Sequence, residues 1–341
     1  MMFWPTGAIL LKKTSTNKMK STFFVTGATG FIGANLVREL VKLGQKTSII
    51  VRDKKLNWRL YDIADKLDIY ECDIQDKKLH TIVKKITPDY IFHLARYGNL
   101  PQEDDIHKMI DVNLKGTINL IDAVKQNPFK LFINAGSGDE YGVKETAMRE
   151  TDLLKPLNNN GVIKLATTLY CQKEAIRNAI PIINLRLFTP YGYFEGENRL
   201  IPAVILSVLE ERPIRVSNSA YVRDFIFIED VINVYLRAVK MRHKYGEVYN
   251  IGSGKQHSVG EIVQMIQKIT KNRSRIEWGT VGKQARYIEP LRWEADIAKA
   301  KKTLHWEPKF SIESGLEKTV EWFEKNKNLY RATTQIANPQ T

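Results

Sequence analysis

Residues 26–33 read Thr-Gly-Ala-Thr-Gly-Phe-Ile-Gly and directly follow the apolar run Phe23-Phe24-Val25. Glycine at every third position between a strand and a helix lets the backbone turn tightly and come close to a diphosphate. The helix predicted over residues 31–43, ended by Gly44, then directs its amide-rich N-terminus at that anion. This stretch therefore predicts a dinucleotide site formed by Gly27, Gly30, Phe31, Ile32 and Gly33.

Strand-like and helix-like segments alternate along most of the chain. Strands are predicted over 22–26, 48–52, 67–72, 90–94, 130–135, 182–186 and 247–250, with helices over 31–43, 78–86, 106–125, 161–178 and 229–241. Such alternation indicates an α/β fold with a Rossmann-type doubly wound parallel sheet, covered on both faces.

The C-terminal part departs from this alternation. Pro190, Gly192, Gly196 and Pro202 crowd together, and further helices are expected over 201–211, 259–270 and 312–325. We expect a smaller, mainly substrate-binding lobe that closes over the carboxyl edge of the sheet. The predicted division is a loose N-terminal extension over 1–20, the NAD(P)-binding domain over 21–188 with 226–252 returning to it, the lobe over 189–330 and a flexible tail over 331–341.

Composition argues against several classes of protein. Cys72 and Cys171 are the only cysteines among 341 residues, so we expect no disulfide framework, no metal site and a reducing, cytoplasmic location. No apolar run approaches the roughly 20 residues of a membrane helix, so no membrane partner is expected. The net charge of +14 is spread over separated lysine pairs, which favours solvated faces over nucleic-acid binding.

The end of the second predicted strand bears on which dinucleotide is bound. Val51 stands where an acid would hold the adenosine ribose hydroxyls, and Arg52 follows it, which is typical of a site for a 2′-phosphate. NADP(H) is therefore the preferred cofactor. Asp53 is an alternative ribose ligand, which leaves NAD(H) open.

Further landmarks follow the glycine run in a fixed order. They are Cys72-Asp73-Ile74, His93-Leu94-Ala95-Arg96, Val112-Asn113-Leu114-Lys115-Gly116-Thr117, Arg223-Asp224-Phe225 and Tyr249-Asn250-Ile251-Gly252. From about Phe23 to Lys325 the chain resembles the extended short-chain dehydrogenases/reductases of the nucleotide-sugar epimerase, dehydratase and reductase type.

This resemblance implies roles for several landmark residues. Asp73 and Ile74 would border the adenine, and Leu94 and Ala95 would lie beside the cofactor. His93 ends an apolar strand, so we expect a packed, hydrogen-bonded side chain rather than a base. Asn113 is expected to tie a helix to a strand.

The resemblance also implies a catalytic set, with one departure. The family places Ser or Thr four residues before Tyr-Gly and a Tyr-x-x-x-Lys on a later helix. Ser137 precedes Tyr141-Gly142, and Lys164 fits the lysine that also contacts the cofactor, but Asn160 stands at the tyrosine position. An amide does not titrate near neutral pH, although it still donates a hydrogen bond.

Three explanations of Asn160 remain open at this stage. It is an engineered trap for complexes, a natural divergence with proton transfer rerouted through water or Tyr97, or the mark of a non-catalytic relative.

The substrate side of the resemblance implies a nucleotide-diphosphate sugar. Residues 185–192 resemble the family's Arg-x-Phe-Asn-x-x-Gly segment, with Thr189 in place of the asparagine and Phe188 against the nicotinamide. Arg223 and Arg286 match arginines that grip the diphosphate through bidentate, charge-assisted hydrogen bonds. The predicted substrate-binding set is Ser137, Thr189, Arg223 and Arg286.

The residues after Ser137 bear on the reaction. Members that eliminate water place an acid and a base there, but here Gly138 empties one position and only Asp139 fills the other. A 4,6-dehydratase is thus disfavoured. The first expectation is NADPH-dependent reduction of a nucleotide-linked 4-keto-6-deoxyhexose, because of Arg52, and the second is 4-epimerisation.

Three further expectations follow from the resemblance. A non-catalytic protein that binds NADP(H) and a nucleotide sugar is the alternative of a different class. A homodimer is implied because helices 106–125 and 161–178 pair between subunits in relatives. The resemblance also implies a role in polysaccharide biosynthesis, which relatives commonly serve.

Overall fold

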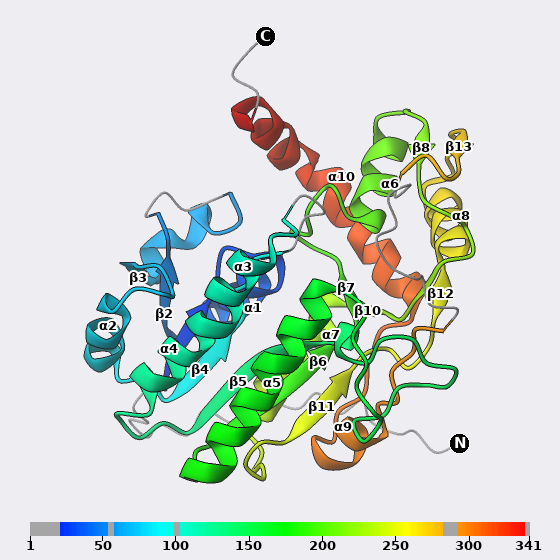
Figure 1. Ribbon diagram of the computed structural model, residues 1–341. Helices are drawn as coiled ribbons and strands as arrows, with labels where there is room; N and C mark the ends of the chain where they lie inside the picture. The colour runs from blue at the N-terminus through cyan, green and yellow to red at the C-terminus, as the bar shows by residue number, and fades with distance from the viewer. Residues whose placement is uncertain (1–20, 54–57, 99–102, 282–291, 338–341) are drawn as a thin grey trace, which may run out of the picture.

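The computed structural model describes residues 21–53, 58–98, 103–281 and 292–337, with side chains up to residue 330. Its centre is a seven-stranded sheet in the order β11-β6-β5-β4-β1-β2-β3, in which all neighbours run parallel (Figure 1). This confirms the predicted α/β, Rossmann-type fold. The strands are β1 (Thr22–Thr26), β2 (Lys46–Val51), β3 (Asp68–Glu71), β4 (Tyr90–His93), β5 (Leu131–Ser137), β6 (Ile182–Leu187) and β11 (Val248–Ile251).

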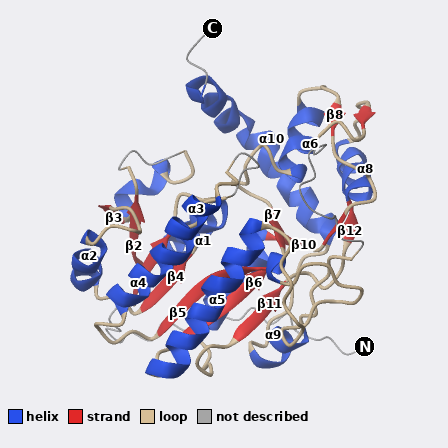
Figure 2. Cartoon of the chain, in the orientation of Figure 1, coloured by secondary structure: helices blue, strands red, loops and turns tan. Residues whose placement is uncertain are grey.

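Helices cover both faces of this sheet (Figure 2). The helices α2 (Lys78–Ile86), α4 (Gly116–Val124) and α5 (Asn159–Asn178) share one apolar core with Phe24. On the other face, α1 (Phe31–Lys42) and α7 (Ile228–Ala238) share a core with Phe23 and Val25. Successive residues of β1 therefore enter different cores, as the alternation of side chains along a strand requires.

The order of the strands fixes where a ligand binds. The chain passes from β1 outward through β2 to β3, then returns to β4 on the other side of β1. In open parallel sheets, ligands bind at the carboxyl ends of the strands next to such a reversal. The end of β1, which carries the glycine run, lies at this point.

The helix predicted over 106–125 is not uniform. It consists of α3 (Ile106–Met109), the π-helical segment η2 (Ile110–Lys115) and α4. Asn113 lies within η2, donates to the carbonyl of Tyr97 at 2.9 Å and accepts from its amide at 2.7 Å. Asn113 thus ties this helix to the loop that follows β4 and not to a strand, and the wider π turn accompanies the tie.

The smaller lobe lies beside the carboxyl edge of the sheet, on the right of Figure 1. Its helices are α6 (Leu200–Leu209), α8 (Val259–Thr270) and α10 (Ile312–Ala337), which share one apolar core. Three separate two-stranded sheets lie outside the main sheet: β7 (Thr189–Tyr191) with β10 (Phe225–Phe227), β9 (Val222–Arg223) with β12 (His257–Ser258), and β8 (Ile214–Arg215) with β13 (Ile276–Glu277).

The remaining described elements are η1 (Tyr61–Lys66), η3 (Gly138–Glu140) and α9 (Ala298–Thr303). The helix α10 continues to Ala337, well beyond its predicted end at residue 325 and through part of the expected tail. The predicted extension over 1–20 lies outside the described residues. Within the described ranges, no helix has the length and apolar character needed to span a membrane.

Candidate active site

The glycine run forms a tight loop between β1 and α1. Gly27 has φ +69°, and a Cβ placed on it would lie 2.5 Å from the amide nitrogen of Ala95. A Cβ on Gly33 would lie 2.1 Å from the carbonyl oxygen of Gly27. Gly30 caps α1 without a side chain, so the first-turn amides of Phe31, Ile32 and Gly33 remain available to an anion. This cradle fits the diphosphate of a dinucleotide.

The other predicted cofactor residues gather at the same edge. Each follows the carboxyl end of a parallel strand: Arg52 after β2, Asp73 and Ile74 after β3, Leu94 and Ala95 after β4, and Phe188 after β6. Val51 is buried at the end of β2, whereas Arg52 is exposed beyond it. The structure therefore assembles the predicted cofactor residues along one edge of the sheet.

His93 is a structural side chain. Its Nδ1 lies 2.7 Å from the hydroxyl of Thr26, and its Nε2 lies 2.8 Å from the hydroxyl of Thr117. Burial lowers the pKa of His93 to about 3, so the ring is neutral at ordinary pH. This confirms the expectation of a packed, hydrogen-bonded histidine.

Lys164 lies buried on α5, one helical turn after Asn160. Its ammonium donates to the carbonyl oxygen of Ala135 at 2.6 Å. Burial, and secondly the charge of Arg96, lowers the pKa of Lys164 to about 8. The lysine therefore brings a positive charge to the end of β5 at neutral pH.

Ser137 and Asn160 are linked through Asp139. The Ser137 hydroxyl oxygen accepts from the amide of Asp139 at 3.1 Å. The Asn160 Nδ2 donates to the Asp139 Oδ2 at 2.6 Å. The structure thus brings Ser137 and Asn160 together, with Asp139 between them.

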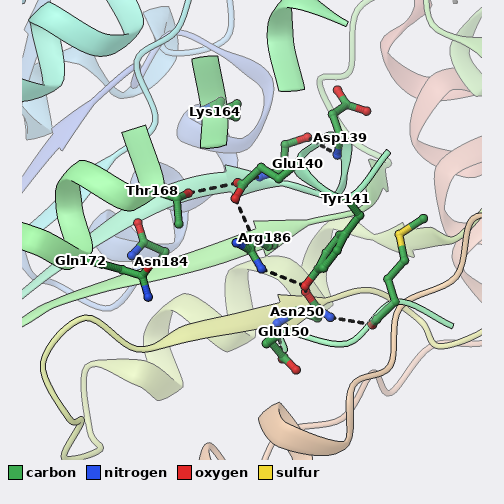
Figure 3. A network of polar contacts seen from close by, with 12 residues as sticks. Asp139, Glu140, Tyr141, Glu150, Lys164, Thr168, Gln172, Asn184, Arg186 and Asn250 are labelled. Carbon is green, nitrogen blue, oxygen red and sulfur yellow. Dashed lines mark hydrogen bonds and ion pairs between the residues drawn. The ribbon is translucent and has the colours of Figure 1, made fainter. Parts of the chain in front are cut away.

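A buried polar network lies directly beneath this group, and sequence reasoning missed it (Figure 3). Arg186 of β6 donates through Nε to Glu140 Oε2 at 2.7 Å and through a terminal nitrogen to the Tyr141 hydroxyl at 3.0 Å. That hydroxyl donates to Asn250 Oδ1 of β11 at 2.7 Å, and Thr168 of α5 donates to Glu140 Oε1 at 3.1 Å. An arginine within the apolar strand 182–187 is the sequence signal that could have indicated a buried carboxylate partner.

This network positions the turn that carries Ser137. Glu140 Oε1 accepts from the backbone amide of Ser137 at 2.9 Å, which completes a capping box on η3. A Cβ on Gly136 would lie 2.7 Å from the same oxygen, so the strand must be free of a side chain there. The buried carboxylate therefore fixes the end of β5 from which the Ser137 side chain projects.

Aromatic rings lie close to the residues that the sequence predicts to bind the substrate. Phe188 and Trp293 lie with ring centroids 6.1 Å apart, and Arg223 lies over Trp293 at 5.6 Å. A Cβ on Gly138 would lie 3.2 Å from Trp293 and 3.5 Å from Phe188. The amide of Thr189 donates to the carbonyl of Asp224, next to Arg223. Arg286 lies outside the described residues.

Asp224 organises the loops around Arg223. Its buried carboxylate accepts from the amides of Ser253, Gly254 and Ala295 at 2.6, 3.1 and 3.0 Å. Burial raises the pKa of Asp224 to about 6 despite these bonds. The neighbouring Arg223 therefore lies where three segments of the chain are hydrogen-bonded together through Asp224.

Comparison with known proteins gives consistent matches along the chain. The family described as "NAD dependent epimerase/dehydratase family" matches residues 23–252. The UDP-glucuronate 4-epimerase of Thermodesulfobacterium geofontis is 28% identical, over 91% of this chain and 98% of the relative. The GDP-6-deoxy-D-mannose reductase of Pseudomonas aeruginosa is 27% identical, over 87% and 95%.

A solved structure agrees with these relatives. The epimerase Mth375 of Methanothermobacter thermautotrophicus has a TM-score of 0.83 at 27% identity, covering 92% of this chain and 95% of that one.

Proposed function

The chain belongs to the NAD-dependent epimerase/dehydratase family, whose members here are nucleotide-sugar enzymes, and on that premise we propose that it reduces the C4 carbonyl of a nucleotide-linked 4-keto-6-deoxyhexose. The observation that carries the proposal is Gly138. Elimination of water needs an acid and a base after Ser137, and Gly138 has no side chain to supply one of them. Hydride chemistry at C4 needs only one proton-transfer group.

The packing around Gly138 supports this choice. A Cβ at this position would already touch Phe188 at 3.5 Å and would lie 3.2 Å from Trp293, closer than an ordinary contact. A dehydratase-type acid there would require the Trp293 ring to shift by a few tenths of an ångström. We therefore place the reaction at C4 and not at the neighbouring carbons.

We further propose that NADP(H) is the preferred cofactor. Arg52 is exposed immediately beyond β2, at the edge where the adenosine ribose of a dinucleotide on the glycine cradle would lie. A guanidinium at this place binds a 2′-phosphate through charge-assisted hydrogen bonds. Val51, at the end of β2, has no group to hold ribose hydroxyls.

The chain's own residues would act as follows. The bound dinucleotide supplies the hydride. The Ser137 hydroxyl donates a hydrogen bond to the C4 oxygen of the sugar and orients it. The Lys164 ammonium favours the negative charge that develops on that oxygen, and Arg223 binds the diphosphate that anchors the sugar. Thr189 and the Phe188 ring would complete the wall beside the reacting carbon.

A second candidate is 4-epimerisation of a nucleotide sugar. It is favoured by the similarity to the UDP-glucuronate 4-epimerase and to the epimerase structure, and it uses the same carbon and the same residues. It differs in needing the proton to be taken from an alcohol as well as returned to an oxygen.

We also propose a homodimer through α5. Val162, Leu169 and Ile176 are exposed and lie seven residues apart, which places them along one stripe of the helix. Light scattering of the purified protein at micromolar concentration is expected to give twice the mass of the chain. A monomer mass at that concentration would contradict the proposal.

A substrate panel tests the proposed reaction. The protein is incubated with NADPH or NADH and with UDP-, dTDP-, GDP- and CDP-linked 4-keto-6-deoxyhexoses, and with UDP-glucose and UDP-glucuronate as epimerase substrates. We expect consumption of NADPH with at least one keto sugar. Epimerised product without net consumption of NADPH would favour the second candidate instead.

A further inference from the structure

Among the side chains that depart from the family pattern, Asn160 and Arg96 both interact with Asp139. Asn160 replaces the tyrosine and donates to Asp139 Oδ2 at 2.6 Å. Arg96 stands where the family's His-Leu-Ala-Ala has its second alanine, and its positive charge interacts with the carboxylate of Asp139. The departures thus converge on one carboxylate.

Asp139 is held firmly but keeps one oxygen available. Its amide donates to the Ser137 hydroxyl oxygen, and its carbonyl oxygen would lie 2.5 Å from a Cβ on Gly161. The first turn of α5 therefore packs directly on the backbone of Asp139. The side chain is half-buried, and no described residue hydrogen-bonds its Oδ1.

The Asn160 side chain donates a hydrogen bond to Asp139 and does not itself carry a proton to the substrate. A carboxylate only accepts, so the Asn160 NH₂ must face it. The Asn160 Oδ1 is buried without a hydrogen-bond partner among the described residues. The amide thus fixes the carboxylate and leaves the proton to another group.

Two other titratable groups of the site, Glu140 and His93, already hydrogen-bond to other residues. Glu140 is saturated by Arg186, Thr168 and the Ser137 amide. Both ring nitrogens of His93 are bonded to threonines. The ring of Tyr97, the alternative considered from the sequence, lies under the Lys108 ammonium at 4.7 Å, and no contact among the described residues joins its hydroxyl to Asn160.

We infer that Asp139, positioned by Asn160, exchanges the proton of the substrate's C4 oxygen in place of the absent phenol. The inference rests on the proposed function. In reduction, C4 gains a hydride from the reduced dinucleotide, which is thereby oxidised, and the carbonyl π pair moves to the oxygen. That oxygen takes a proton through Asp139: the carboxylate accepts one proton from the solvent, passes it to the oxygen and is a carboxylate again at the end of the step.

A double-mutant cycle tests the inference. In the parent protein, which has Asn160, Asp139→Asn is expected to lower kcat by roughly 10²–10⁴-fold. In the Asn160→Tyr background, where a phenol is restored, the same substitution is expected to cost less than about 10-fold. Asp104→Asn is the matched control, because Asp104 accepts from Asn159, next to Asn160, at 3.2 Å on the exposed side. Full turnover of Asp139→Asn in the parent protein would overturn the inference.

A second readout does not depend on turnover. The affinities for NADP⁺ and for the nucleotide sugar, measured by calorimetry, are expected to stay within about 2-fold in Asp139→Asn. A crystal structure with NADP⁺ and a nucleotide hexose is expected to place the sugar O4 about 2.5–3.0 Å from Asp139 Oδ1. An Asp139 carboxylate turned away from O4 overturns the inference alone. Absence of turnover on every substrate in both backgrounds counts against the proposed function.

Discussion

Asp139 and Glu140 are adjacent carboxylates on one short turn, and their surroundings are opposite. Glu140 is fully buried, at 0% exposure, and bonds Arg186, Thr168 and the Ser137 amide. Asp139 is half-buried and accepts one side-chain hydrogen bond, from Asn160. In Figure 3 the two carboxyl groups point in different directions, Glu140 toward Arg186 and Asp139 away from it.

This difference separates a structural acid from a chemical one. A buried carboxylate whose oxygens are all bonded cannot take or give a proton without breaking the network around it. A carboxylate with an unused oxygen and a fixed backbone is free to meet a substrate. Neighbours in sequence thus carry different duties, because η3 turns one side chain inward and the other toward the carboxyl edge.

The largest effect is expected from the inner carboxylate. Glu140→Ala leaves the Arg186 guanidinium buried and unpaired, which should lower the free energy of unfolding by about 3–5 kcal/mol. Asp139→Ala should lower it by less than about 1 kcal/mol, since a single hydrogen bond is lost. Urea denaturation of both variants measures the contrast.

A double variant keeps this test decisive if Glu140→Ala fails to fold. Replacing both charged partners, as Glu140→Leu with Arg186→Met, removes the unpaired charge and should recover much of the lost stability. Equal destabilisation by the Glu140 and Asp139 single variants would contradict the distinction between the two acids.

The next effect concerns Lys164, which we place near the reacting oxygen although its side chain is buried. Burial holds its folded-state pKa at about 8, below the ordinary 10.5, so the unfolded chain binds more protons between these values. The cost of the buried charge is complete below pH 8 and disappears as the pH rises to about 10.5. Lys164→Met should therefore raise the free energy of unfolding by about 1–3 kcal/mol at pH 7 while reducing turnover.

The pH series supplies the check on Lys164. The stability difference between Lys164→Met and the parent, measured by thermal unfolding, should shrink from pH 8 to pH 10.5. A Lys164→Met variant that is less stable than the parent at pH 7 would mean that the ammonium stabilises the fold.

The smallest effect is expected at the distant adenosine end, which neither acid touches. Arg52→Ala should weaken NADPH binding by roughly 10–100-fold, the contribution of hydrogen bonds to a charged group. It should change NADH binding by less than about 2-fold and leave stability unaltered. Fluorescence titration measures both affinities, and an equal loss for the two cofactors would argue against a 2′-phosphate site.

The sequence predicts local features of this molecule well. The apolar strands of the sheet, the glycine cradle and the packed His93 follow from short-range patterns that fix them individually. The Gly27 and Gly33 close approaches are implied by their spacing and are confirmed by the backbone contacts at Ala95 and Gly27.

Contacts between distant segments could not be predicted in the same way. The Arg186–Glu140 pair depends on β5 and β6 being neighbours in register, and the Asn160–Asp139 bond depends on Gly161 letting α5 approach η3. The π turn in the helix over 106–125 reflects the tertiary bonds of Asn113, since its local pattern is that of an ordinary helix. Each of these features joins residues far apart in the sequence, and the spacing of apolar residues within one segment carries no information about such contacts.

Transfer of deuterium from the cofactor tests the central claim most directly. The protein is incubated with NADPH carrying deuterium at the transferable C4 position and with a nucleotide-linked 4-keto-6-deoxyhexose, and the sugar is analysed by mass spectrometry and NMR. The account predicts one deuterium at C4 of the product sugar. Conversion of the sugar without deuterium at C4, or deuterium at another carbon, would contradict it.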